Sequence, residues 1–147
     1  MDMDPYAALF IAKRVHRDQK RRGGAPYIFH PVRVAENVRA LGGTDVQVAA
    51  ALLHDAIEDS PTSNLAALVE EIRRDCGQEV LDLVMVLTHR EKETYRQYLA
   101  AVHMAGQDAV LIKVCDIFDN LMDDPMNPLK YLAGLAQLTG CKTTWED

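Results

Sequence analysis

Apolar residues recur at the spacing of an α-helix along almost the whole chain. Ala8, Ile11, Ala12 and Val15 share one face of a helix that we expect over residues 5–20. Nowhere are two alternating segments joined by an Asn-Gly or Asp-Gly turn, the usual signal of a β-hairpin. The pattern therefore predicts an all-α fold.

Glycine and proline divide the rest of the chain into further helices. Pro26 predicts an extended stretch over residues 27–29, and Pro31 suits the first turn of the helix that follows. The later helices are expected at residues 31–41, 46–59, 62–77, 79–88, 95–104, 109–122 and 128–138. We expect one compact bundle of roughly seven to nine helices.

The segment 46–59 is the most apolar of the predicted helices. Residues 48–53 are all alanine, valine or leucine, so hardly any face is left for water. A helix that is apolar all round is usually buried. We therefore place it at the centre of the bundle, with Ser60-Pro61 ending it.

Length, charge and cysteine content narrow the class of protein. The 147 residues predict one domain over residues 1–147, and the net charge of −6 makes DNA or RNA an unsuitable partner. Three cysteines without a C-x-x-C pair argue against a disulfide scaffold and for the reducing cytoplasm.

Charged residues interrupt every apolar run and no leader-like start is present, so we expect no membrane partner. The oligomeric state, a homo-oligomer included, stays open.

Four ionisable residues lie at the end of the apolar segment 46–59: His54, Asp55, Glu58 and Asp59. On a continuous helix His54 would stack with Glu58, and Asp55 with Asp59. Acidic groups at a helix C-terminus oppose the helix dipole, which favours a functional cluster. The alternative is a solvated last turn where the helix reaches the surface, and this motif alone does not decide between the two.

Asp116 presents the same anomaly among apolar neighbours in the segment 109–122. A buried, unpaired carboxylate is strongly unfavourable, so this group needs a cation, a hydrogen-bond network or a proton. Pairing with Lys113 or a helix cap is the purely structural alternative. His30, between an aromatic residue and a proline, is more often a structural residue than a ligand when it is considered alone.

Two histidines and two aspartates from three predicted helices form a mixed nitrogen and oxygen donor set: His30, His54, Asp55 and Asp116. Such a set suits manganese, iron or zinc better than calcium. A divalent ion would lower the pKa of a bound water and polarise a phosphoryl oxygen, while Glu58 or Asp59 orients the water or carries its proton. The predicted chemistry is metal-assisted hydrolysis of a phosphoester or phosphoanhydride.

A basic run precedes the turn at Gly23-Gly24 and consists of Lys13, Arg14, Arg17, Lys20, Arg21 and Arg22. Guanidinium groups bind phosphates in a bidentate manner, so this run would supply contacts to a phosphorylated substrate near His30. The alternative is the solvated end of an amphipathic helix, whose cations complement the helix dipole.

Three segments, Gly24–Pro31, Ala50–Asp59 and Val110–Asn120, resemble the motifs of the HD superfamily and stand in the family order. More narrowly, they resemble the hydrolase domain of RelA/SpoT-type alarmone enzymes and its stand-alone small relatives. The resemblance spans roughly residues 21–120, and this ordered combination is far more specific than a single His-Asp pair.

The resemblance implies an all-helical, Mn²⁺-dependent hydrolase that removes pyrophosphate from the 3′ position of ppGpp or pppGpp, as in the stringent response. The metal ligands that it implies are His30, His54, Asp55 and Asp116. Glu58 and Asp59 match the acidic pair that activates or positions the attacking water. Arg21 and Asn120 match nucleotide-contacting positions, and we add Arg22 to the expected substrate contacts.

The chain departs from the family pattern beside the expected site. The family commonly continues its last motif as Asp-Arg-Leu-His-Asn, whereas residues 116–120 read Asp-Ile-Phe-Asp-Asn, which bears on substrate identity. Arg22 stands where lysine is common, and Gly23 where a small hydroxyl-bearing residue often occurs. Since the sequence ends at Asp147, we expect a hydrolase without a synthetase region.

Three hypotheses of function follow. The leading one is a manganese-dependent hydrolase of ppGpp or pppGpp. The second keeps the metal site but takes a nucleoside monophosphate or NADPH, because residues 117–119 would reshape the pocket. The third is a catalytically silent module that senses nucleotides or binds protein, against which the full set of ligands and acids argues. His16, His89 and His103 lie outside the motifs and are given no role.

Overall fold

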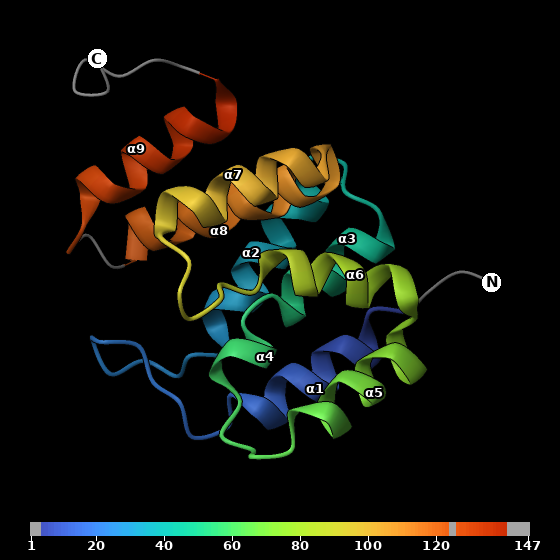
Figure 1. Cartoon of the computed structure of the whole chain (residues 1–147). Coiled ribbons are helices and arrows are strands. Elements are labelled where there is room, and N and C mark those ends of the chain that lie inside the picture. Colours follow the sequence, from blue (N-terminus) through green and yellow to red (C-terminus); the bar gives the residue numbers. More distant parts are fainter. Residues whose placement is uncertain (1–3, 124–125, 141–147) are drawn as a thin grey trace.

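The computed structural model describes residues 4–123 and 126–140, and over these residues the chain folds into nine α-helices (Figure 1). The helices are α1 (Tyr6–Val15), α2 (Phe29–Ala40), α3 (Asp45–Leu53), α4 (Ala56–Asp59), α5 (Leu65–Cys76), α6 (Gln78–Leu87), α7 (Tyr95–Ala105), α8 (Gln107–Asp123) and α9 (Pro128–Thr139). The described residues contain no β-strand beyond an isolated bridge between Lys20 and Pro26. The all-α prediction is confirmed.

Helix α3 occupies the centre of the bundle and packs against α1, α2, α6 and α8. Ala49, Ala50 and Ala51 are fully buried, and their small side chains let the surrounding helices approach closely. In Figure 1, α1 and α5 lie on one side of this centre, and α7, α8 and α9 lie on the other. The prediction that this segment is the buried core helix is confirmed.

The first helix ends earlier than its apolar pattern predicts. Helix α1 stops at Val15, and a loop occupies residues 16–28. Backbone hydrogen bonds fold this loop onto itself: the Arg21 N–H donates to the Ala25 carbonyl over 2.8 Å, and the Tyr27 N–H donates to the Gln19 carbonyl over 2.9 Å. The prediction of helix as far as residue 20 was therefore wrong.

The second helix begins earlier than predicted. Pro26 restricts its own φ and the residue before it, so the residues after it are free to enter a helix, and α2 begins at Phe29. The predicted extended stretch over residues 27–29 was wrong. As a result His30 lies in the first turn of α2 and not in a loop.

The predicted helix 46–59 is broken in two. Helix α3 ends at Leu53, and Asp55 takes backbone angles of φ −105° and ψ 1° before the short helix α4. The His54 side chain stabilises this turn by donating from Nδ1 to the Ala51 carbonyl over 2.6 Å. The prediction of one continuous helix over residues 46–59, on which the stacking of His54 with Glu58 and of Asp55 with Asp59 rested, was therefore wrong. At this interruption the side chains of His54 and its neighbour Asp55 lie close together, with His54 Nε2 3.0 Å from Asp55 Oδ2.

The remaining predicted helices are present with small shifts of their ends. Asn64, not Thr62 or Ser63, caps α5 by accepting from the Ala67 N–H. Cys76 and Cys115 are buried free thiols, and burial raises the pKa of Cys76 to about 11. Cys141 lies outside the described residues. No helix in the described part of the chain is long and apolar enough to cross a membrane.

Candidate metal centre

Four predicted ligands converge although they come from separate parts of the chain. His30 is in α2, His54 and Asp55 follow α3, and Asp116 is in α8. One ligand atom from each lies within 4.8 Å of all the others. The two histidines and Asp116 are buried and Asp55 is less buried, so the donors meet inside the bundle.

Asp116 is the hub of this cluster. Its Oδ1 lies 2.9 Å from His30 Nε2 and 3.1 Å from His54 Nε2. Asp55 completes the cluster, with its Oδ2 lying 3.0 Å from His54 Nε2. Both imidazoles therefore present Nε2 to carboxylate oxygens.

The remaining ring nitrogens explain why Nε2 faces inward. His54 Nδ1 lies 2.6 Å from the Ala51 carbonyl, and His30 Nδ1 lies 2.6 Å from Asp119 Oδ2. Both partners are acceptors, so each Nδ1 carries a proton, and Nε2 is the nitrogen of each ring that is left to bind a metal ion. Two imidazole nitrogens and two carboxylates form a donor set suited to a divalent transition-metal ion. The residues therefore fit such an ion.

The charges of the cluster are strongly coupled. Burial by itself would lower the pKa of His54, but Asp55 and Asp116 raise it well above its usual value. Burial would likewise raise the pKa of Asp116, but Lys113 and His54 hold it well below its usual range. Two carboxylates are thus kept ionised, and their charge is balanced by protonated imidazoles or by a bound cation.

The structural alternative for Asp116, pairing with Lys113, is also realised. Lys113 Nζ lies 2.6 Å from Asp116 Oδ2 and 4.8 Å from the centre of the Tyr98 ring. This contact uses one carboxylate oxygen and leaves Oδ1 for the histidines. The two interpretations of Asp116, as a metal ligand and as the ion-pair partner of Lys113, are therefore compatible. The lysine holds the carboxylate in one orientation.

Tyr27 is a member of the site that the sequence reading missed. Its hydroxyl donates to Asp55 Oδ2 over 2.5 Å, while its ring contacts those of His16 and His30. Burial and the charge of Asp55 raise the pKa of the hydroxyl, so it remains a donor. Its position next to Pro26 in a family motif was the only signal in the sequence.

Glu58 and Asp59 lie on α4, directly beside the cluster, and each has its own support. Glu58 accepts from the His89 backbone N–H over 2.6 Å. Asp59 accepts from Gln19 Nε2 over 3.1 Å, and Gln19 Oε1 in turn lies 2.7 Å from His16 Nδ1. His16 and His89, which received no role from the sequence, thus belong to the surroundings of the acid pair.

Partial burial raises the pKa of Asp59, and the negative charge of Asp55 raises it further. The hydrogen bond from Gln19 acts in the opposite direction, because it stabilises the ionised form. A cavity of about 410 Å³ lies beside this carboxylate and is lined by Gln19 and Arg17 among others. Asp59 is therefore a carboxylate of raised pKa that borders a water-accessible cavity.

Of the three predicted substrate contacts, Arg21 and Asn120 lie together beside the cluster, whereas Arg22 does not. Arg21 Nη2 donates to Asn120 Oδ1 over 2.9 Å, and Arg21 Nε donates to Asp123 over 2.9 Å. The two predicted contacts therefore hydrogen-bond each other beside His30, and only 13% of the Arg21 side chain is exposed. Arg22, by contrast, is exposed on the loop.

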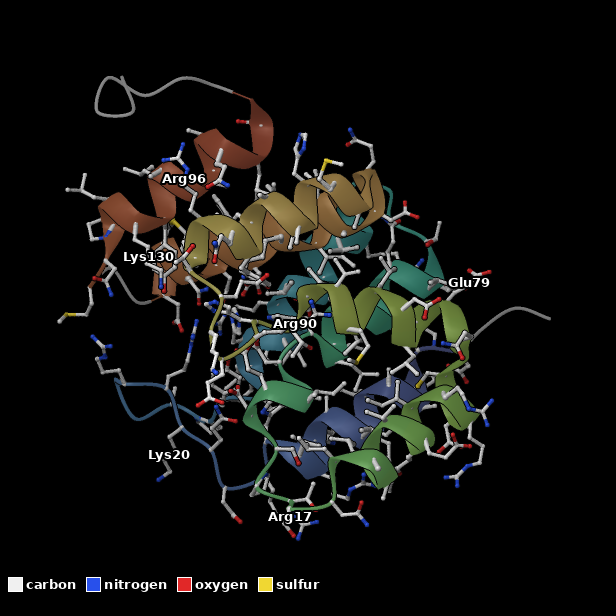
Figure 2. All side chains as sticks on the ribbon, viewed as in Figure 1. Arg17, Lys20, Glu79, Arg90, Arg96 and Lys130 are labelled. Carbon is white, nitrogen blue, oxygen red and sulfur yellow. The ribbon has the colours of Figure 1, made fainter. Side chains whose placement is uncertain are left out.

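The basic run is divided by the fold. Arg14 pairs with Glu71 of α5. Arg17 and Lys20 are exposed on the segment that follows α1, at the lower edge of the molecule in Figure 2. Only the later part of the run, with Arg21, reaches the cluster.

Asp119 occupies the position where the family motif commonly has histidine. Its Oδ1 accepts from Arg33 Nε over 2.7 Å, and its Oδ2 accepts from Arg33 Nη2 over 3.0 Å. Burial alone would raise the pKa of Asp119, but hydrogen bonds from His30 and Arg33 lower it to about 2. This buried carboxylate is therefore ionised beside one of the candidate ligands.

Comparison with known proteins agrees with this geometry. The profile of the HD domain family matches residues 8–121. A guanosine-3′,5′-bis(diphosphate) 3′-pyrophosphohydrolase of Aquifex aeolicus is 36% identical over 118 residues, which cover 76% of this chain and 16% of the relative. A probable GTP pyrophosphokinase of Mycobacterium leprae is 40% identical over 120 residues, covering 78% of this chain and 15% of the relative.

The chain thus spans about one sixth of the length of these curated relatives. A solved structure of a metazoan orthologue of SpoT, described as hydrolysing ppGpp and having a role in starvation responses, gives a TM-score of 0.75 at 25% identity. That match covers 92% of this chain and 83% of the other. The chain belongs to the HD domain family.

Proposed function

We propose that this domain hydrolyses the 3′-pyrophosphate of ppGpp and pppGpp with the help of a divalent ion, with manganese as the expected metal. The observation that carries the proposal is the convergence of four ligand atoms within 4.8 Å, directly beside two acidic residues. The relatives named for this activity support the choice of substrate. Hydrolysis of ppGpp would release pyrophosphate and leave GDP.

The residues that would hold the ion are His30, His54, Asp55 and Asp116. When bound, the ion supplies Lewis acidity, which activates water and stabilises charge on a phosphoryl oxygen. The protein fixes the ligands before binding: Lys113 orients Asp116, and Tyr27 orients Asp55. Such prepositioning lowers the cost of assembling the site.

Glu58 and Asp59 would position the attacking water and take up its proton. Both are on the one-turn helix α4, which directly follows the helix interruption at Asp55, itself one of the ligands. A carboxylate whose pKa is raised towards neutral pH is a more effective base than one with an ordinary pKa. The raised pKa of Asp59 supports this role.

A second candidate substrate is NADPH or a nucleoside monophosphate. The observation that favours it is the engagement of Arg21 by Asp119 and Asp123, because the arginine charge is then partly neutralised before any nucleotide binds. A pocket with less free positive charge suits a substrate with fewer phosphates. The two candidates share the metal centre and the acid pair.

The assay that separates these functions uses manganese-loaded protein with ppGpp, NADPH and nucleoside monophosphates, and identifies the products by chromatography. We expect release of pyrophosphate from ppGpp, and none of this activity in a His54→Ala variant. Turnover of NADPH or a monophosphate alone would establish the second candidate. Tight ppGpp binding without any product would indicate the silent module.

Activity is expected to fall at acidic pH as Asp59 is protonated. Since Gln19 lowers the pKa of this carboxyl, a Gln19→Leu variant should raise it and move the acidic limb of the kcat profile to higher pH. The measurement is kcat against pH for the wild type, for Gln19→Leu and for the distant control Gln137→Leu. An acidic limb that is the same in all three proteins would contradict the role of Asp59.

The cytoplasmic location and the single-domain boundary at residues 1–147 remain predictions from the sequence.

The net charge of −6 describes the chain without a bound ion. A divalent cation in the centre would offset much of the local negative charge of the four acids at the site. The surroundings of Arg22 would then be less unfavourable for a phosphorylated nucleotide than the total charge suggests.

A further inference from the structure

The ring of His30 is held between two carboxylates of the same helix. Asp116 and Asp119 are three residues apart on α8 and so project from the same side of it. Asp116 Oδ1 lies 2.9 Å from His30 Nε2, and Asp119 Oδ2 lies 2.6 Å from His30 Nδ1. One carboxylate thus faces the ligand nitrogen of the imidazole, and the other faces the opposite nitrogen.

Asp119 is the group that accepts a hydrogen bond from Nδ1 of His30. Arg21 Nη2 also lies near Nδ1, at 3.2 Å, but a guanidinium has no acceptor atom. Of these two neighbours, only the carboxylate can accept a hydrogen bond. The contact therefore requires a proton on Nδ1, and Nε2 is the nitrogen left to bind a metal ion.

Two arginines fix the orientation of this carboxylate. Arg33 holds both of its oxygens, over 2.7 Å and 3.0 Å. Arg33 and Arg21 are themselves joined through Asp123, whose Oδ2 lies 3.0 Å and 2.9 Å from them. Asp119 is only 5% exposed, so water competes little for its hydrogen bonds. His30 thus has a rigid, charged partner, whereas His54 has the neutral carbonyl of Ala51.

We propose that Asp119 is a positioning residue that orients His30 for metal binding and fixes its tautomer. The proposal rests on the metal-dependent function proposed above, but not on the identity of the substrate. A carboxylate behind a ligating histidine also strengthens it as a donor, and removal of such partners typically weakens metal binding about 10- to 100-fold. The Asp at position 119 therefore supports the metal centre in place of the histidine of the family motif.

The test compares two conservative variants, one in the ion-pair network and one outside it. Asp119→Asn keeps the shape of the side chain but removes its charge from His30, and Glu36→Gln removes the charge of an exposed carboxylate on α2, the helix that carries His30. Manganese affinity is measured by electron paramagnetic resonance titration without substrate, and circular dichroism reports folding. We expect Asp119→Asn to bind manganese about 10- to 100-fold more weakly, and Glu36→Gln to bind it as the wild type does.

Equal affinity in Asp119→Asn and the wild type would overturn the proposal, as would equal losses in both variants. A second readout covers an Asp119→Asn protein that does not fold. In ¹⁵N-labelled wild-type protein loaded with Zn²⁺, we expect the His30 proton on Nδ1, and a proton on Nε2 would also overturn the proposal. Neither readout depends on turnover. A failure of the ppGpp assay can therefore be told apart from a failure of the role proposed for Asp119.

Discussion

Replacing His54 with alanine is expected to abolish turnover and tight metal binding together. His54 supplies a buried Nε2 that lies within 3.1 Å of oxygens from both Asp55 and Asp116. Its removal takes one of four donors away and leaves the carboxylates of Asp55 and Asp116 without this cationic or metal-bound partner. Inductively coupled plasma mass spectrometry gives the metal content, and the ppGpp assay gives the rate.

The matched control is His103→Ala, because His103 is exposed on α7 and belongs to no described part of the centre. It should retain the metal and the full rate. Full activity in a metal-free His54→Ala protein would refute the assignment of the ligand set.

Replacing Glu58 with glutamine, or Asp59 with asparagine, is expected to lower kcat by about 10²- to 10⁴-fold while leaving metal binding intact. The range is the usual contribution of a general acid or base. The amides keep the size of the side chains but cannot accept a proton from water. Steady-state kinetics with ppGpp and manganese titration measure the two effects separately.

A Glu91→Gln variant serves as the control, since Glu91 is an exposed acid in the segment between α6 and α7. Its kcat should equal that of the wild type. If both acid-pair variants also retain the wild-type kcat, proton transfer in this domain does not depend on α4. A loss of metal binding in these variants would instead place the acids among the ligands.

The fold was largely predictable from periodicity, because nearly every helix buries a regular apolar face. Ala8, Ile11, Ala12 and Val15 are buried in α1 as their spacing requires. Helix ends were less predictable, since they depend on side-chain hydrogen bonds that spacing does not encode. The break at Asp55 is the clearest case: apolar periodicity continues to Ile57, yet the His54 side chain stabilises a turn.

The four candidate ligands could be selected from the sequence because polar residues stand out among apolar neighbours. Their supporting residues could not, because each reaches the site from a distant position in the chain. Gln19 contacts Asp59 across 40 residues, and His30 contacts Asp119 across 89. Asp119 was noticed only as a departure from a motif, and its partner Arg33 carried no signal at all. Arg21 was predicted as a substrate contact, and its ion pair with Asp123 could not be foreseen.

The most direct test of the central claim is a crystal structure of manganese-loaded protein with an anomalous difference map recorded near the manganese absorption edge. The structure predicts one strong peak within coordination distance of His30 Nε2, His54 Nε2 and carboxylate oxygens of Asp55 and Asp116. A fully occupied peak elsewhere, or no peak between these four side chains in protein that hydrolyses ppGpp, would contradict the account.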